Sequence, residues 1–169
     1  MSQKENLTPL IKNNLHKYKK EWIEERERNE NDDNIEDEID IYEVFEIIRD
    51  INDPEYPYNL EALNIISLED IIVDNNNRII TVYFTPTIET CSFSSLIGLS
   101  IKKKLKNFIS PKYHINVLIK EAKSEYNKNL NKQINDKERV ESSSLNENIS
   151  KIYDKITIDE EKYFNFLKS

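Results

Sequence analysis

The sequence predicts a small single domain of the α/β (α+β) class, with a mixed sheet covered by helices and the order α-β-β-α-β, plus helical extensions at both ends. Two observations predict this class. Apolar residues recur at helical spacing in two separate segments, and β-branched residues cluster in three short segments between and after them. A strand, a crossover helix and a further strand favour a parallel pair with helices packed on the sheet.

The first element is a helix that begins near Ile41 and ends near Asn52. Its apolar residues share one helical face and are Ile41, Val44, Phe45, Ile48 and Ile51. Asp53-Pro54 follows, and proline stops a helix because it lacks the backbone N–H. Residues 71–73 and 79–84 are then expected to form two β-branched strands, joined into a hairpin by the turn-forming residues 74–77.

A second helix is expected from Ser94 to about Ile109. Its apolar stripe consists of Ile97, Ile101, Leu105 and Phe108. The alternating residues Ile115, Val117 and Ile119 predict a third strand, which should lie parallel to the second. Gly98, the only glycine of the chain, falls inside this helix, where glycine costs about 1 kcal/mol relative to alanine. We expect a close packing contact at Gly98.

The chain divides into three expected segments. Residues 1–40 form an acidic N-terminal extension, residues 41–158 the folded domain, and residues 159–169 a C-terminal tail. The extension contains a short amphipathic helix that either packs on the core or docks on a partner, with the stripe Ile11, Leu15, Tyr18 and Trp22. Near the C-terminus, helical spacing recurs in Leu145, Ile149, Ile152 and Ile156, and a last short helix is expected from Thr157.

Composition excludes several classes of protein. A net charge of -8 disfavours a nucleic-acid binder, whose affinity depends on neutralising phosphates. A single glycine is incompatible with the glycine-rich phosphate loops of kinases, P-loop enzymes and Rossmann dehydrogenases. The sequence contains no apolar run of the roughly 20 residues that cross a bilayer, and no signal or transit peptide is recognisable. The unpaired Cys91 favours a reducing compartment, the cytosol or the nucleus.

Cys91 is the candidate for chemistry, because it is expected between a strand end and a helix start. Backbone N–H groups and the helix dipole stabilise a thiolate there, although an inert, half-buried cysteine is an equally open interpretation. With only His16 and His114 as further soft ligands, the chain lacks the donors for a complete zinc or iron-sulfur site of its own. The alternative is a small cysteine-dependent redox or hydrolytic enzyme that uses Cys91, with His114 as its base.

Three ordered motifs carry a family resemblance over residues 42–158. The first comprises Ile48-Arg49-Asp50-Ile51-Asn52-Asp53-Pro54-Glu55-Tyr56-Pro57 with Leu60-Glu61-Ala62-Leu63-Asn64. The second comprises Phe84-Thr85-Pro86-Thr87-Ile88, Cys91-Ser92 and Leu96-Ile97-Gly98-Leu99-Ser100-Ile101-Lys102. The third comprises Asn131-Lys132-Gln133 and Asp136-Lys137-Glu138-Arg139-Val140. With these motifs the chain resembles the cytosolic iron-sulfur cluster assembly component 2 family, the type found as a subunit of a mitotic-spindle-associated complex.

The resemblance implies a non-catalytic adaptor, cytoplasmic and also nuclear, that helps transfer iron-sulfur clusters to apo-proteins. The implied partners are a WD-repeat propeller protein, a HEAT-repeat scaffold and apo iron-sulfur clients, with neither nucleic acid nor membrane bound directly and a homodimer left open. No cofactor is expected to bind permanently, but a transient iron-sulfur cluster is compatible with Cys91 as a reactive cysteine or metal ligand. Arg49, Asp53 and Glu55 form either a local charge and capping cluster or part of a partner-binding surface, and the resemblance favours the partner surface. Trp22, on the N-terminal stripe, is a further partner-binding candidate that rests on its position in the stripe alone. The sequence departs from the family at Glu89-Thr90, where Pro-His is common; the added carboxylate should raise the pKa of the thiol.

Overall fold

The computed structural model describes residues 38–86, 91–122, 124–138 and 151, with only the backbone of Cys91 and Ser92. The elements within these residues are helix α2 (Ile41–Ile48), the 3-10 turn η1 (Leu68–Asp70), strands β1 (Ile71–Asp74) and β2 (Ile79–Phe84), helix α3 (Cys91–Phe108), strand β3 (His114–Ile119) and helix α4 (Glu125–Asn135). The predicted order α-β-β-α-β is confirmed from α2 to β3.

The three strands of this part of the chain form one mixed sheet in the order β1-β2-β3. β1 and β2 pair antiparallel as the expected hairpin, with Ile71 opposite Val82. β2 and β3 pair parallel over their whole length, from Ile79 opposite His114 to Phe84 opposite Ile119. The parallel pairing follows from the crossover through α3, which begins near the end of β2 and returns the chain to the start of β3. The prediction of a mixed sheet is therefore confirmed.

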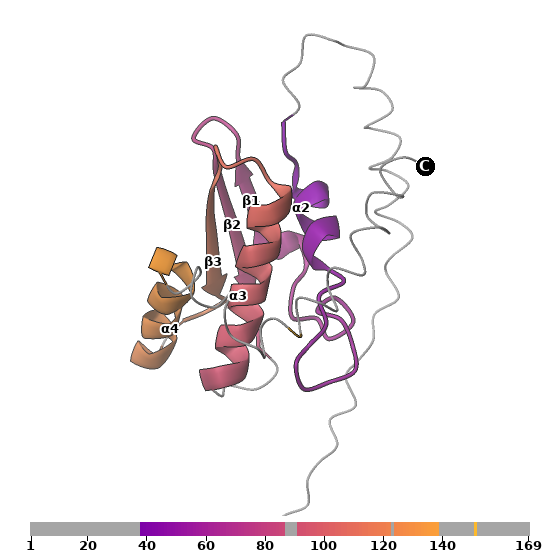
Figure 1. Ribbon diagram of the computed structural model, residues 1–169, viewed down its shortest axis with the longest axis vertical. Coiled ribbons are helices and arrows are strands. Elements are labelled where there is room, and N and C mark those ends of the chain that lie inside the picture. Colours follow the sequence, from indigo (N-terminus) through magenta and orange to yellow (C-terminus); the bar gives the residue numbers. More distant parts are fainter. Residues whose placement is uncertain (1–37, 87–90, 123, 139–150, 152–169) are drawn as a thin grey trace, which may run out of the picture.

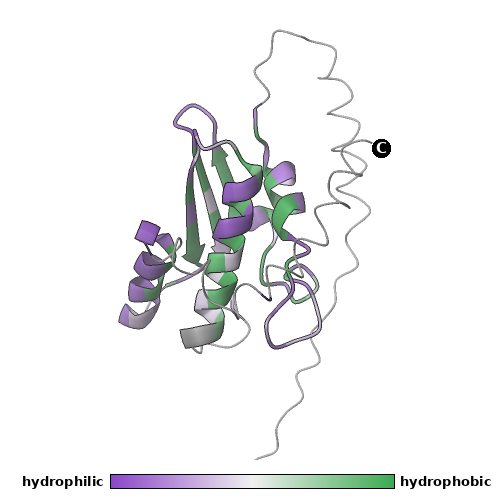
Figure 2. Ribbon diagram, in the orientation of Figure 1, coloured by the Kyte–Doolittle hydropathy of each residue, from purple (hydrophilic) through white to green (hydrophobic). Residues whose placement is uncertain are grey.

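The core lies between the sheet and the helices. Every second residue of β2 and β3 is buried, so each of these strands has one apolar side. Among the helices, α3 and α4 contact β3, and α2 contacts β1. Fully buried members include Ile80, Val82, Phe84, Ile101 and Leu105. Figure 2 shows this division, with hydrophobic residues along the strands and hydrophilic residues on most of α4 and the last turns of α3.

Helix α2 starts where the sequence places it and ends earlier. Asp40 is its N-cap and accepts a hydrogen bond from the Glu43 N–H at 2.8 Å. The helix ends at Ile48 rather than near Asn52, because the chain then turns sharply: the Ile51 N–H donates to the Ile48 carbonyl at 3.2 Å. Ile51 nevertheless stays in the core, with 1% of its surface exposed. The apolar pattern of the sequence therefore identified Ile51 correctly as a buried residue, although Ile51 lies beyond the end of α2.

Helix α4 was not predicted from the sequence. Ser124 caps its first turn by accepting from the Asn127 N–H at 3.1 Å. Only Leu130 and Ile134 of its residues are buried in the core, and the rest of the segment is rich in asparagine and lysine. Asparagine has a low helix propensity, so neither composition nor periodicity indicated a helix here.

Several expectations concern residues that the structure does not describe. The amphipathic stripe with Trp22, the C-terminal stripe from Leu145 to Ile156 and the last helix from Thr157 all lie outside the described residues. The boundaries 1–40, 41–158 and 159–169 therefore stay predictions. Within the described residues, none of the helices combines the length and the apolar character that spanning a bilayer requires.

Candidate functional site

Two of the three motif segments meet at one end of the domain, and the third begins there. β2 and β3 run parallel, so their carboxyl ends lie at the same edge of the sheet, and α3 begins beyond it (Figure 1). The segment after α2 is attached to this edge, because the Thr85 N–H donates to the Ile65 carbonyl at 2.8 Å. The carboxyl edge of parallel strands is the usual place for binding sites in α/β folds. We therefore take this end as the candidate site.

Cys91 is the first residue of α3, whereas the sequence placed the start of this helix at Ser94 and Cys91 just before it. His114 is the first residue of β3 and is exposed. The two residues lie at opposite ends of the crossover, since α3 has 18 residues and a helix rises about 1.5 Å per residue, or roughly 25 Å in all. The fold therefore does not bring Cys91 and His114 together as a nucleophile and its base. Among the described residues, no cluster of three or more His, Cys, Asp and Glu side chains is arranged for metal binding.

Arg49 holds the end of α2 to the following loop. Its Nε donates to Oε2 of Glu61 at 2.7 Å, a second guanidinium nitrogen lies 2.7 Å from the same oxygen, and a third contact reaches Glu46. The guanidinium also lies 5.5 Å from the centre of the Phe45 ring, within cation–π range. Burial raises the pKa of the Glu61 carboxyl above its usual range, although Arg49 acts in the opposite direction. These contacts make Arg49 an internal clamp.

Asp53 shapes the loop that follows. Its side chain is 7% exposed, and its Oδ1 accepts from the N–H groups of Glu55 and Tyr56, both at 2.8 Å. The loop closes like a short hairpin, because the Asp53 N–H donates to the Tyr58 carbonyl at 2.9 Å. Asp53 therefore acts within the loop and is too buried to offer a wide contact surface, whereas Glu55 is exposed.

The same loop presents an aromatic side chain that sequence reasoning missed. Tyr58 is 40% exposed and follows the exposed Pro57. A tyrosine between Pro57 and Asn59, in a turn-rich segment, was the available signal. Tyrosine is enriched at protein interfaces because it adds contact area at a low cost in side-chain entropy. Of the four partner-binding candidates, Arg49 and Asp53 build the loop, Glu55 is displayed by it, and Trp22 lies outside the described residues.

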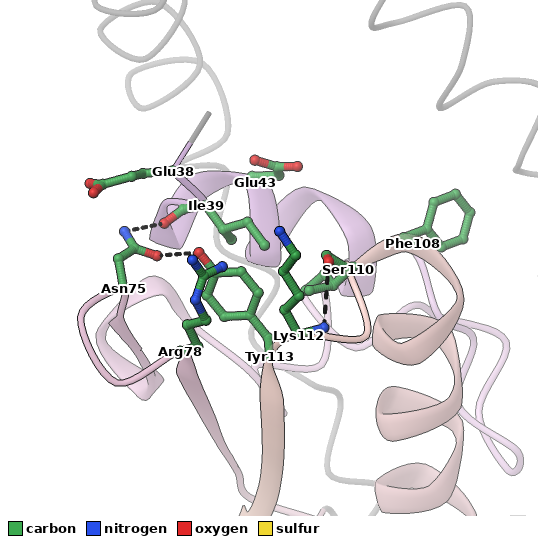
Figure 3. A pocket seen from close by; sticks show the side chains of 10 residues that line it. Glu38, Ile39, Glu43, Asn75, Arg78, Phe108, Ser110, Lys112 and Tyr113 are labelled. Carbon is green, nitrogen blue, oxygen red and sulfur yellow. Dashed lines mark hydrogen bonds between the residues drawn. The ribbon is translucent and has the colours of Figure 1, made fainter. Parts of the chain in front are cut away.

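A hollow of about 370 Å³ lies at the other end of the domain (Figure 3). Arg78 and Lys112 line it together with Glu38 and Glu43, so its charges are mixed. The Tyr113 hydroxyl donates to Asn75 Oδ1 at 2.8 Å, and Asn75 Nδ2 donates to the Ile39 carbonyl at 3.0 Å. These bonds fasten the segment before α2 to the hairpin turn. None of the three sequence motifs contributes to this hollow.

Comparison with known proteins places the chain in a family. No protein-family model matches the chain. A MIP18 family protein of Schizosaccharomyces pombe is 44% identical over 102 residues, which cover 59% of this chain and 57% of that protein. Cytosolic iron-sulfur assembly component 2B of Dictyostelium discoideum is 42% identical over 90 residues, or 53% of this chain and 55% of that protein. The chain thus matches only a little over half the length of these two relatives.

Protein AE7-like 1 of Arabidopsis thaliana is covered more fully, with 38% identity over 112 residues, 66% of this chain and 73% of that protein. The fold and site define a small α+β domain whose motif residues gather at the carboxyl edge of two parallel strands. The chain belongs to the MIP18 family, the family of cytosolic iron-sulfur assembly component 2.

Proposed function

We propose that the chain is a non-catalytic adaptor in cytosolic iron-sulfur cluster assembly, which helps deliver clusters to apo-proteins of the cytoplasm and nucleus. Family membership is the observation that carries this proposal, because the relatives from Dictyostelium and mouse are named cytosolic iron-sulfur assembly component 2B. The implied partners are a WD-repeat propeller protein, a HEAT-repeat scaffold and the apo-protein clients. Cys91 is the residue through which a transient cluster or a reactive thiol would act.

The loop of residues 53–59 is the surface that we assign to partner binding. Asp53 and Arg49 hold this loop through contacts inside the domain, so its ordering is completed before a partner arrives. A preorganised loop loses less conformational entropy on binding. Glu55 gives it a negative charge and Tyr58 an aromatic contact. This combination fits a partner surface with an apolar pocket and a basic rim.

Affinity purification of the full chain tests the proposal. The tagged protein should co-purify with a propeller and a HEAT-repeat protein in its own cells, identified by mass spectrometry. Tyr58→Ala should reduce recovery of a partner roughly tenfold, a typical loss for one interface tyrosine. Tyr126→Ala is the matched control, because Tyr126 is 42% exposed and lies on α4, away from this loop.

Two results would contradict different parts of this proposal. Normal recovery of both partners with Tyr58→Ala would remove the loop from the interface while leaving the adaptor function standing. Absence of both partners from the wild-type purification, together with a catalytic turnover that depends on Cys91, would replace the adaptor with the cysteine-dependent enzyme.

A further inference from the structure

The hollow at the hairpin end of the domain lies at the point where the described chain begins (Figure 3). Glu38, the first described residue, lines one side of it together with Glu43 of α2. Arg78 of the hairpin turn and Lys112 of the turn before β3 line the other side. Residues 1–37 lie outside the described residues, and the chain that precedes Glu38 ends at the rim of this hollow. The hollow is therefore within direct reach of the N-terminal extension.

The hollow also has an apolar surface that the rest of the domain holds in place. Ile39 and Tyr113 line it, and each packs against the core with part of its side chain while the rest stays accessible. The Tyr113 hydroxyl donates to Asn75 Oδ1 at 2.8 Å, and this bond fixes the orientation of the ring. We call Ile39 and Tyr113 the apolar pair. Because the apolar pair is already ordered, it loses little conformational entropy when a further apolar side chain packs on it.

The walls of the hollow and the chain that enters it carry opposite charge. Glu38 belongs to the entering chain, so the remaining walls have two basic side chains, Arg78 and Lys112, and one acidic side chain, Glu43. Residues 29–37 contain five acidic residues and no lysine or arginine. The acidic residues are Glu30, Asp32, Asp33, Glu36 and Asp37. This segment is therefore complementary in charge to the walls of the hollow.

The same segment has one apolar residue, Ile35, three residues before Glu38. Three extended residues span at most about 10 Å, so Ile35 stays close to the hollow. A tether this short gives the segment a high effective concentration at the hollow, on the order of millimolar. The chain's own segment is therefore favoured as the occupant over the same segment of a second copy.

We propose that residues 29–37 dock in the hollow of their own chain, with Ile35 against the apolar pair and acidic side chains beside Arg78 and Lys112. The docked segment holds the N-terminal extension at the hairpin end of the domain, opposite the end that carries the motif segments. This inference is independent of the proposed role in cluster assembly.

Two double variants of the full chain test the docking. Arg78→Glu with Lys112→Glu reverses the charge of the basic side of the hollow, whereas Lys128→Glu with Lys132→Glu makes the same change of charge at two exposed lysines of α4. Amide hydrogen exchange of residues 29–37 is followed by NMR. These amides should exchange roughly fivefold faster in the hollow variant than in the control, the change expected when two partly exposed ion pairs are lost.

Carbodiimide crosslinking of the wild type gives a second readout, because it joins a lysine to a carboxylate that it contacts. Lys112 should be joined to an acidic residue of the segment 29–37. Crosslinking a mixture of isotopically labelled and unlabelled protein, followed by mass spectrometry, shows whether the two residues belong to the same chain. The proposal predicts crosslinks within one chain.

Three outcomes would overturn the proposal. One is equal exchange of residues 29–37 in the two folded double variants. Another is a set of crosslinks from Lys112 that reaches only Glu38 and Glu43. The third is crosslinking only between labelled and unlabelled chains, which would make a second copy the occupant. If the hollow variant does not fold, Lys112→Glu, which changes one exposed side chain, is compared with Lys128→Glu, and equal exchange in these two variants rejects the docking.

Discussion

Cys91 stands where the chain enters the first turn of α3, at the end of the domain that carries the motif segments. Cys91→Ser nearly preserves the size of the side chain, but the serine hydroxyl stays protonated near neutral pH and is a poor soft ligand. The variant should therefore keep the fold and the partners while the iron-sulfur content of client proteins falls. Client cluster content, measured by iron incorporation in cells, checks this expectation. Normal client maturation would make Cys91 a structural thiol, and lost partner binding with unchanged circular dichroism would make it an interface residue.

Lys102 is a lysine with only 4% of its surface exposed. Burial, assisted by the nearby Lys106, lowers the pKa of Lys102 from 10.5 to about 8. In the unfolded chain the ordinary pKa returns, so between pH 8 and pH 10.5 the unfolded state binds more protons than the folded state. The cost of burying the charge is therefore fully present below pH 8 and is relieved as the pH rises.

Lys102→Met tests this linkage. Methionine carries no charge, so the variant lacks this contribution to the pH dependence. Between pH 7 and pH 10.5 the free energy of unfolding of the wild type should therefore rise by roughly 1 to 3 kcal/mol relative to that of the variant. Urea unfolding at several pH values measures the difference, and Lys128→Met, at an exposed lysine of α4, is the control. Parallel pH curves for wild type and Lys102→Met would show that Lys102 titrates normally in the folded protein.

At the level of elements, Gly98 explains how closely α3 and α4 approach. The predicted packing contact at Gly98 is confirmed, since an added Cβ would lie 2.6 Å from Cδ1 and 3.1 Å from Cγ1 of Ile134. Gly98→Leu should lower the free energy of unfolding by roughly 1 to 3 kcal/mol, even though leucine favours a helix more than glycine does. Adding Ile134→Ala should restore part of the loss by opening space, and chemical denaturation of both variants measures it. A Gly98→Leu protein as stable as the parent would rule out the steric explanation.

The contrast between α3 and α4 shows which elements the sequence could predict. The stripe from Ile97 to Phe108 predicted α3 and alternation predicted β3, because burial on one side imposes a period on the sequence. β1 and β2 were predicted from their β-branched residues. α4 follows a different logic, since Asn131 and Asn135 face the sheet with polar atoms. Polar residues that bind the edge of a strand face the inside of the domain, so the usual rule that inward-facing residues are apolar does not identify them. For Asp53 the sequence left a local capping role and a partner surface open, and the structure shows the capping role, because its carboxylate accepts from the N–H groups of Glu55 and Tyr56.

At the scale of the whole molecule, the buried core residues among those that the structure describes run from Val44 to Ile134. Deleting residues 1–37 should therefore leave a domain with a single cooperative thermal transition, while partner affinity falls if Trp22 contributes to an interface. Calorimetry of the shortened and full chains checks the prediction. The cut stops before Ile39 because Ile39 packs on the core and its carbonyl accepts from Asn75. Loss of the cooperative transition would show that the stripe of Ile11, Leu15, Tyr18 and Trp22 belongs to the core, at roughly 1.5 to 3 kcal/mol per large side chain.

The sequence alone did not predict that two motif segments gather at one end of the domain or that the third begins there. This arrangement nevertheless follows from the topology that was predicted. A parallel β2–β3 pair with one crossover fixes the carboxyl ends of both strands and the start of α3 at the same edge. The segment after α2, which includes the loop of residues 53–59, is attached to them through the bond between Thr85 and Ile65, which connects residues distant in sequence. Such a contact leaves no periodic signal, so only the structure reveals it.

The same topology leaves the hairpin turn at the opposite end, and this gives the protein a place for a reporter. The turn is held by Asp74, whose carboxylate accepts from the Asn77 N–H at 3.0 Å, while Asn76 is exposed. A short epitope inserted after Asn76 would exchange the bond between Asn77 and Asp74 for a longer loop, and it would sit at the far end of the sheet from Cys91 and Tyr58. The labelled chain should then be traceable in cells with its motif-bearing end unaltered. The turn is therefore a suitable site for a label that reports where the protein is in the cell.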